Sequence, residues 1–100
     1  MNDIFNDPVI GWLQKKAKLE PKIKKLVLFG SRARDDAHEK SDYDLAIYTL
    51  DNKNPVEWIL DVKENINTLC GIDVVFVSKE TSQSLLDAII NEGVLIYERN

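Results

Sequence analysis

Two aspartates separated by one residue, Asp42 and Asp44, open an apolar run of the chain. Side chains of a strand alternate between its two faces, so both carboxylates are predicted to point the same way. Their Cα atoms then lie roughly 6.6 Å apart, at about 3.3 Å per residue. Carboxylates at that spacing can converge on Mg²⁺, a hard cation that binds a few carboxylates together with substrate phosphates. The pair therefore predicts metal-assisted chemistry on a nucleotide, with aspartates at a solvated strand edge as the simpler alternative.

A Gly-Ser pair, Gly30 and Ser31, ends an earlier apolar run. Glycine permits a close approach to the backbone, and backbone N–H groups in such a turn can bind phosphate. Serine can cap a following helix while its hydroxyl contacts a β- or γ-phosphate. Arg32 and Arg34 follow, and their guanidinium groups suit phosphate or a partner, although a solvated position fits the sequence equally well. The turn is predicted to bind nucleotide phosphates, and a plain strand-to-helix turn with a serine cap is compatible with the same residues.

The composition is that of an ordinary globular chain of 100 residues, with 44% hydrophobic and 30% charged residues. One domain, residues 1–100, is expected, with a modest core. The net charge of −4 argues against general nucleic-acid binding, which normally needs a basic surface. Cys70 is the only cysteine of the sequence, so no internal disulfide is possible and a reducing cytoplasm is expected. No apolar run approaches the ~20 residues of a membrane span, so no membrane association is expected.

Other side chains are better explained without chemistry. His38 is the only histidine of the sequence, which excludes a multi-histidine metal site, and it is expected to be exposed. Trp12 and Trp58 fall at helical spacing among aliphatic residues and are expected in the core. A dense basic patch is interpreted as a solvated face, with docking of an acidic or nucleic-acid partner as the alternative; it comprises Lys15, Lys16, Lys18, Lys22, Lys24 and Lys25.

Helices and strands that would position these residues alternate along the chain. Asp7 and Pro8 predict a helix start, and Pro21 marks the exit of that helix. A strand is predicted over 26–29, then a short helix from Ser31 and a charged loop up to residue 40, then a strand over 43–48. A helix is predicted from 55 to about 69, a strand over 72–77, a helix capped at 81 or 82 that stops at Gly93, and a strand over 94–97. This alternation predicts one α/β layer structure.

The chain resembles the polymerase-β-like nucleotidyltransferase superfamily in the string GSRAR (30–34), followed by SDYDLA (41–46). The resemblance is closest to the minimal nucleotidyltransferase (MNT) branch, and it extends to IDVV (72–75) and EGVLIY (92–97). It implies a small mixed sheet of about four strands flanked by helices. It also implies that Asp73 joins Asp42 and Asp44 in a catalytic, metal-binding triad, on a strand adjacent in the sheet. Related sequences commonly have glycine where this chain has Asp35, and aspartate adopts a positive φ less easily than glycine.

Within the MNT branch, the resemblance implies a Mg²⁺-dependent transferase that moves AMP from ATP to a tyrosine hydroxyl of a HEPN-type toxin ribonuclease. Asp73 would help to deprotonate the acceptor hydroxyl, and the chain would act as an antitoxin. One alternative is a non-catalytic antitoxin that masks the toxin by stoichiometric binding. Another is nucleotidyl transfer to a small molecule such as an aminoglycoside, which usually requires a second domain. A nuclease or polymerase is disfavoured by the acidic balance of the chain.

Overall fold

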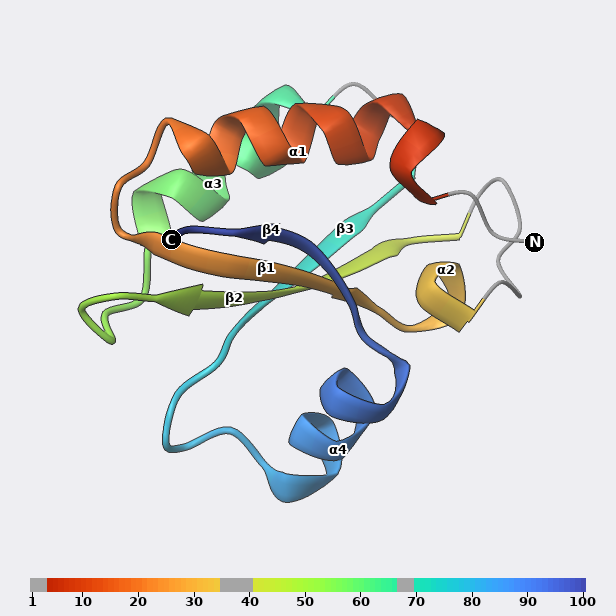
Figure 1. The fold of residues 1–100 in the computed structure, drawn as a ribbon, viewed down its shortest axis with the longest axis vertical. Coiled ribbons are helices and arrows are strands. Elements are labelled where there is room, and N and C mark those ends of the chain that lie inside the picture. Colours follow the sequence, from red (N-terminus) through yellow and green to blue (C-terminus); the bar gives the residue numbers. More distant parts are fainter. Residues whose placement is uncertain (1–3, 35–40, 67–69) are drawn as a thin grey trace.

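Residues 4–34, 41–66 and 70–100 are described by the computed structural model of the chain (Figure 1). The elements in chain order are a short 3₁₀ turn η1 (Ile4–Asn6), α1 (Pro8–Lys18), β1 (Ile23–Phe29), α2 (Ser31–Arg34), β2 (Tyr43–Thr49), α3 (Val56–Asn65), β3 (Ile72–Phe76), α4 (Gln83–Glu92) and β4 (Val94–Glu98). The predicted alternation of helices and strands is confirmed. Within the described ranges, each helix is too short or too polar to cross a membrane.

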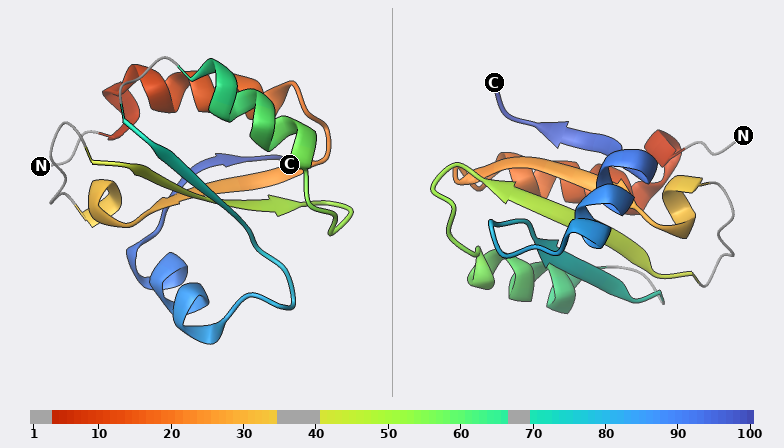
Figure 2. Two further views of the ribbon diagram at one scale, coloured as in Figure 1. Left: turned by 180° about the vertical axis from the view of Figure 1, so that it is seen from behind. Right: turned by 90° about the horizontal axis from the view of Figure 1, so that it is seen from below.

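Four strands form one mixed sheet in the order β3-β2-β1-β4. β1 lies antiparallel to both β2 and β4, and β2 lies parallel to β3. A parallel pair needs a crossover connection, and α3 supplies it between β2 and β3. α1 and α3 cover one face of the sheet, and α4 lies on the other face (Figure 1, Figure 2). The small mixed sheet flanked by helices that the resemblance implies is therefore confirmed.

α1 forms where its sequence signals predict it. The carboxylate of Asp7 accepts a hydrogen bond from the N–H of Val9 at 2.9 Å. Pro8 takes the first helical position, where a backbone N–H would have no partner within the helix, so that its missing N–H costs nothing. Apolar residues at helical spacing turn one face of the helix onto the sheet, and the buried ones are Ile10, Leu13 and Ala17.

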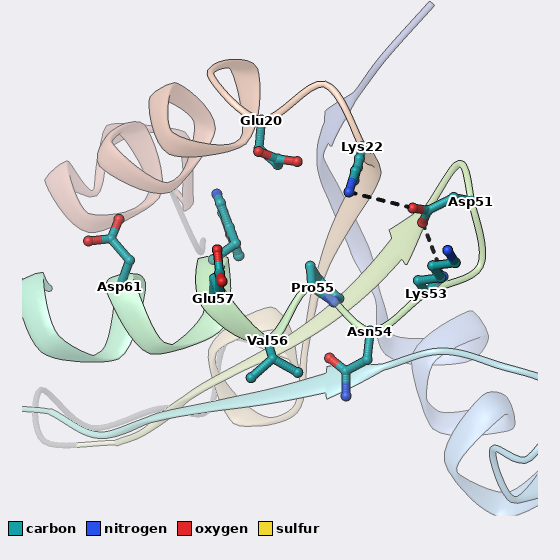
Figure 3. Close-up of a pocket in the computed structure, with 10 residues that line it drawn as sticks. Glu20, Lys22, Asp51, Lys53, Asn54, Pro55, Val56, Glu57 and Asp61 are labelled. Carbon is teal, nitrogen blue, oxygen red and sulfur yellow. Dashed lines mark hydrogen bonds and ion pairs between the residues drawn. The ribbon is translucent and has the colours of Figure 1, made fainter.

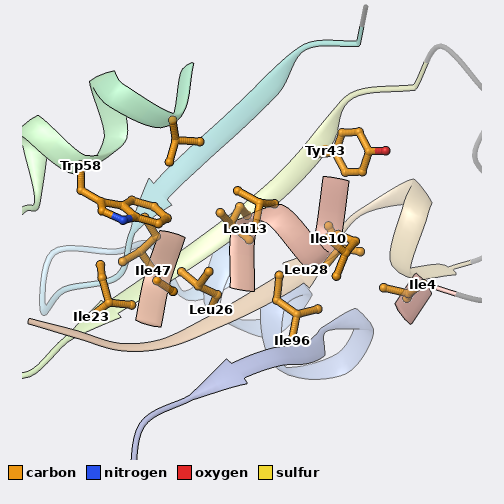
Figure 4. Close-up of a cluster of buried hydrophobic side chains, with 13 residues drawn as sticks. Ile4, Ile10, Leu13, Ile23, Leu26, Leu28, Tyr43, Ile47, Trp58 and Ile96 are labelled. Carbon is orange, nitrogen blue, oxygen red and sulfur yellow. The ribbon is translucent and has the colours of Figure 1, made fainter. Parts of the chain in front are cut away.

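The main core lies between the sheet and the helices α1 and α3 (Figure 4). Trp58 is buried there, and its indole N–H donates to the carbonyl of Lys16 at 3.0 Å, so its one polar atom is satisfied. Trp12 packs against the same core, and both tryptophans are core residues as predicted. The largest fully buried side chains are aliphatic: Ile10, Leu13, Ile23, Leu26, Leu28, Leu45, Ile47 and Val62. A smaller buried cluster on the other face consists of Val27, Phe29, Ala46 and Ile89.

β1 begins earlier than the apolar run predicted, at Ile23 instead of Leu26. Lys24 and Lys25 break the apolar run without breaking the sheet. The ammonium group of Lys25 lies 4.4 Å from the ring centre of Tyr48, so its methylene stem can cover sheet surface. The predicted boundary was wrong because it counted only apolar residues.

α3 ends at Asn65, earlier than the predicted end near residue 69, which itself lies outside the described ranges. The side-chain amide of Asn65 donates to the carbonyl and the carboxylate of Asp61, at 2.9 and 2.7 Å. Such local bonds compete with continuation of a helix. Ile66 is already extended, with φ −63° and ψ 126°. The helix therefore ends about four residues before its predicted limit.

α4 begins and ends at the predicted residues. Ser82 caps it by accepting the N–H of Leu85 at 3.3 Å. Gly93 ends it, but with a φ of −68° that any residue adopts. The need for glycine is one of space, because a Cβ here would overlap the carbonyl of Ile89 and would lie 2.5 Å from Val27 Cγ1. Gly93 therefore lets the end of α4 pack directly on β1.

Candidate active site

The Gly30 turn joins β1 to α2 and lies against the carboxylate of Asp44. Gly30 has a φ of 76°, which glycine adopts without strain. Its carbonyl accepts the N–H groups of Ala33 and Arg34, both at 3.1 Å, so that α2 starts at Ser31. A Cβ on Gly30 would overlap Asp44 Oδ2. Backbone conformation and space therefore both require glycine at this position. With glycine there, the turn can lie directly against the carboxylate of Asp44.

The sheet places the three predicted aspartates at one end of neighbouring strands. Asp44 of β2 and Asp73 of β3 are register partners of a parallel pair, and partners in register point to the same face. Asp42 immediately precedes β2, and its Oδ1 accepts the N–H of Gly71 at 3.1 Å. A Cβ on Gly71 would lie only 2.7 Å from that oxygen. Residues distant in sequence thus meet where β2 and β3 begin.

Burial and the neighbouring carboxylates disfavour ionisation of Asp44. Burial is the main cause that raises the pKa of the Asp44 carboxyl, and repulsion from Asp73 and then Asp42 raises it further. Arg34 opposes this effect by lowering the same pKa, and Glu92 adds to it. A cluster of carboxylates that repel one another suits a divalent cation in both donor type and charge, and oxygen donors are those that Mg²⁺ prefers. The three aspartates therefore fit the metal that the resemblance implies.

The side chains of the three aspartates do not form a closed cage. Among the residues that the structure describes, no three His, Cys, Asp or Glu side chains converge closely enough to hold an ion as they stand. Asp42 is turned toward the N–H of Gly71, and its carboxylate is exposed. The fold thus brings the predicted ligands to one end of the sheet, while their roles as metal ligands stay a prediction.

Arg32 packs against the beginning of β2. Its Nε donates to the carbonyl of Ser41 at 2.9 Å and its Nη2 to Cys70 Sγ at 3.3 Å. The guanidinium lies over the ring of Tyr43, 4.0 Å from the ring centre. The Tyr43 hydroxyl donates to the carboxylate of Asp7 at 2.6 Å, and burial together with this bond raises its pKa. These contacts connect α2, β2 and the start of α1, whereas phosphate binding by Arg32 stays a prediction.

Arg34 contacts α4 through an ion pair that was not predicted from the sequence. Its Nη1 donates to both carboxylate oxygens of Glu92, at 2.9 and 3.0 Å. Glu92 was noted only as part of the string EGVLIY, without a role. The sequence did hold one signal: a glutamate just before a helix-ending glycine opposes the helix dipole, which indicates that a cation compensates it but not which residue supplies that cation.

The remaining candidate residues from the sequence are Ser31, Cys70, Asp35 and His38. Ser31 is the first residue of α2 and is half-buried. Cys70 is half-buried and packs against the main core, as predicted. Asp35 and His38 lie outside the described residues.

A surface pocket of about 480 Å³ lies at the opposite end of β2, beyond the strand's last residue (Figure 3). Its charged side chains include Asp51, which forms an ion pair with Lys22 at 4.0 Å and accepts the N–H of Lys53 at 3.1 Å. The hydrogen bond from Lys53 is the main cause that lowers the pKa of Asp51. At the other side of this pocket Asp61 pairs with Lys16. Both carboxylates of this pair of aspartates therefore have a cationic partner within the chain.

Three of the six lysines of the predicted basic patch contact side chains of their own surroundings. Lys16 pairs with Asp61 and lies 5.8 Å from the ring centre of Trp12. Lys22 pairs with Asp51, and Lys25 lies over Tyr48. These contacts favour the interpretation of a solvated face over that of a docking surface.

Comparison with known proteins defines the class to which this site belongs. The profile of the family described as Polymerase beta, Nucleotidyltransferase matches residues 12–100. The chain therefore belongs to the polymerase-β nucleotidyltransferase family. Among curated proteins, no sequence matches the chain significantly.

Solved structures share this fold at low sequence identity. A chain of a toxin–antitoxin crystal structure with AMP-PNP is 20% identical, with a TM-score of 0.72 over 91% of this chain and 74% of that one. A chain of the tri-AMPylated HEPN toxin of Shewanella oneidensis in complex with an MNT antitoxin is 18% identical, with a TM-score of 0.65 over 91% and 71%. A putative nucleotidyltransferase from Sulfolobus solfataricus is 22% identical, with a TM-score of 0.56 over 90% and 77%. These likenesses show the shared fold.

Proposed function

We propose that this chain is a Mg²⁺-dependent nucleotidyltransferase that moves AMP from ATP to a tyrosine hydroxyl of a HEPN-type toxin, and that it thereby acts as an antitoxin in the cytoplasm. The observation that carries the proposal is the register of Asp44 with Asp73, with Asp44 held against the Gly30 turn. Carboxylates that can hold a metal ion and a turn whose backbone N–H groups can bind phosphates are what transfer from a nucleoside triphosphate requires. Residues 1–100 are proposed to form one minimal catalytic domain.

The proposed reaction assigns each group a task. The acceptor hydroxyl oxygen bonds to the α-phosphorus of ATP, the bond from that phosphorus to the bridging oxygen breaks, and pyrophosphate leaves. Asp42, Asp44 and Asp73 would hold Mg²⁺, which when bound neutralises phosphate charge and steadies the attacking and leaving oxygens. Asp73, which is exposed, would accept the proton of the hydroxyl. The Gly30 turn would bind the phosphates through backbone N–H groups.

The choice of donor and acceptor is supported by the structural neighbours. One of them contains an ATP analogue, AMP-PNP, and another contains a tri-AMPylated HEPN toxin with its MNT antitoxin. Transfer of AMP to a tyrosine would block the hydroxyl and add negative charge. Such a change would weaken RNA binding by a ribonuclease, because RNA is itself an anion.

The proposal is tested by incubating the chain with Mg²⁺, α-labelled ATP and a purified HEPN-type ribonuclease. Label should appear on the ribonuclease, and chelation of Mg²⁺ should abolish it. The Asp42→Asn/Asp44→Asn variant should transfer none, because two of the three carboxylates are gone. Asp51→Asn, at the opposite end of β2, is the matched control and should transfer normally. Absence of label with the wild-type chain, although Mg²⁺-ATP binds, would contradict the proposal.

A second candidate is a non-catalytic antitoxin that masks its partner by binding. It is favoured by the carboxylate of Asp42, which is bonded to Gly71 instead of meeting its two neighbours. The same aspartate variants separate the two candidates. Masking should survive Asp42→Asn/Asp44→Asn, whereas protection that depends on transfer should be lost.

A further inference from the structure

Glu92 occupies an electrostatically unfavourable position. It is the last residue of α4, where the exposed carbonyls of the helix end disfavour a negative charge. The helix cannot move this residue away, because the close contact of Gly93 with Val27 seats the end of α4 on β1. The carboxylate is therefore held in one place at a cost to its own helix. The group that compensates it is the guanidinium of Arg34, held through both carboxylate oxygens.

This ion pair stands beside the proposed catalytic carboxylates. α2 begins directly after Gly30, which lies so close to Asp44 that a Cβ on Gly30 would overlap Asp44 Oδ2. Arg34 ends α2, the four-residue helix that starts at the Gly30 turn. The pair therefore connects three parts of the site: the turn, the carboxylates and the end of α4.

A helix as short as α2 has little stability of its own. An arginine side chain also loses considerable rotamer freedom when it is fixed. A contact that fixes this side chain before the nucleotide arrives removes that loss from the binding step. The Glu92 side chain is 27% exposed and that of Arg34 45%, so the pair is only partly screened by solvent.

We propose that Glu92 is a positioning residue that holds the guanidinium of Arg34 beside Asp44, where its charge faces the phosphates of the bound nucleoside triphosphate. This inference rests on the proposed function. It assigns Glu92 no contact with the reacting atoms. Arg34 acts through its positive charge, and Glu92 sets where that charge lies.

The decisive variant is Glu92→Gln, which keeps the length of the side chain but removes its charge and one of its two strong acceptors. The KM for ATP should rise roughly tenfold, while kcat changes by less than about threefold, because binding and not the chemical step is affected. Arg34→Ala should raise the KM at least as much. The double variant Arg34→Ala/Glu92→Ala should be no worse than Arg34→Ala alone, since Glu92 acts only through Arg34.

Asp87→Asn is the matched control, because Asp87 lies on the same helix and its carboxylate accepts the amide of Gln83 at 2.8 Å. It should leave both constants unchanged. Glu92→Asp, which keeps the charge on a side chain one methylene shorter, should give an intermediate KM. It also provides the test if Glu92→Gln proves unstable in thermal unfolding.

A second readout needs neither nucleotide nor metal. The Arg34 side-chain N–H signal in NMR should show slower motion in the wild-type chain than in Glu92→Gln. A KM in Glu92→Gln that is unchanged or lower, in a folded variant, would overturn the inference and leave the proposed function standing. A wild-type chain that transfers no AMP would contradict the proposed function, and the NMR comparison would then decide alone: equal motion in both proteins overturns the inference.

Discussion

At the scale of single residues, Asp44 must be ionised for its proposed role as a metal ligand, but its ionisation lowers the stability of the metal-free fold. Burial and the carboxylates of Asp73 and Asp42 raise its pKa in the folded protein. The unfolded chain gives up this proton at a lower pH, so the folded state loses stability as pH rises from the unfolded pKa through the raised folded pKa. Above that window the loss is complete and constant. Charge at Asp44 is thus tolerated in the fold, not favoured by it.

Replacement of Asp44 by asparagine should therefore stabilise the metal-free protein. In the presence of a chelator at about pH 7, Asp44→Asn should raise the Tm by a few degrees, because it removes the disfavoured charge. The gain should disappear near pH 3, where the wild-type carboxyl is protonated. Thermal unfolding followed by circular dichroism measures both values. A lower Tm for the variant at neutral pH would contradict the electrostatic account of this site.

Gly30 provides the second test at this scale. Gly30→Ala places a Cβ on Asp44 Oδ2 and forces alanine to a φ of 76°, so it should destabilise the protein by roughly 1–3 kcal/mol and abolish AMP transfer. Gly11→Ala is the control, because a Cβ at Gly11 meets nothing within 4 Å and lies inside α1. It should stabilise by roughly 0.5–1 kcal/mol. Urea titration measures both changes, and a neutral Gly30→Ala would show that the turn can move away from Asp44.

At the scale of elements, sequence signals predicted the helix starts correctly where a neighbouring residue caps the helix. The start of α1 at Asp7 and Pro8 and the start of α4 at Ser82 follow from caps, which depend on neighbours in sequence. The end of α3 was missed because Asn65 bonds back to its own helix, a side-chain choice that apolar spacing does not reveal. Element type was thus predictable, and the exact limits less so.

The candidate site was predictable only in part. Asp44 lies in β2 and Asp42 directly before it, so the common direction predicted for the pair assumed strand geometry at Asp42, whose carboxylate instead accepts the N–H of Gly71. Their meeting with Asp73 depends on the parallel pairing of β2 and β3, which residue types do not specify. That expectation came from the resemblance. The ion pair between Arg34 and Glu92 was missed for the same reason, since it joins two helices that are far apart in the chain.

Asp7 links two elements and supplies a test of their coupling. Its carboxylate caps α1 and also accepts the Tyr43 hydroxyl of β2. Asp7→Ala should cost roughly 1–3 kcal/mol, since it removes both bonds. Tyr43→Phe removes only the second and should cost less, about 1 kcal/mol. Urea unfolding measures both, and equal losses would show that the cap contributes nothing.

At the scale of the whole molecule, the proposed catalytic residues all lie at one end of the sheet. The turn after β1, the starts of β2 and β3 and the end of α4 converge on Asp44. The far end of β2 carries a pocket in which Asp51 is paired with Lys22 and Asp61 with Lys16. The proposed AMP transfer is therefore expected to depend on the first end, where Asp44 and Asp73 lie.

Binding of Mg²⁺-ATP at that end should stabilise the whole fold. At a ligand concentration about 100 times Kd, the gain is on the order of 2.7 kcal/mol. Asp42→Asn/Asp44→Asn should show no such gain, because its ligands for the metal are lost. Differential scanning fluorimetry with ATP, with and without a chelator, measures the effect. A shift of equal size in wild type and variant would place the nucleotide elsewhere on the molecule.

The most direct test of the account is the intact mass of a HEPN-type ribonuclease purified after co-expression with this chain. With the wild-type chain, the ribonuclease should gain the mass of one or more AMP groups, and peptide mapping should place them on tyrosine. With Asp42→Asn/Asp44→Asn, its mass should be that of the unmodified protein and its ribonuclease activity should persist. An unmodified ribonuclease that is silenced equally by both forms of the chain would contradict AMP transfer and establish masking in its place.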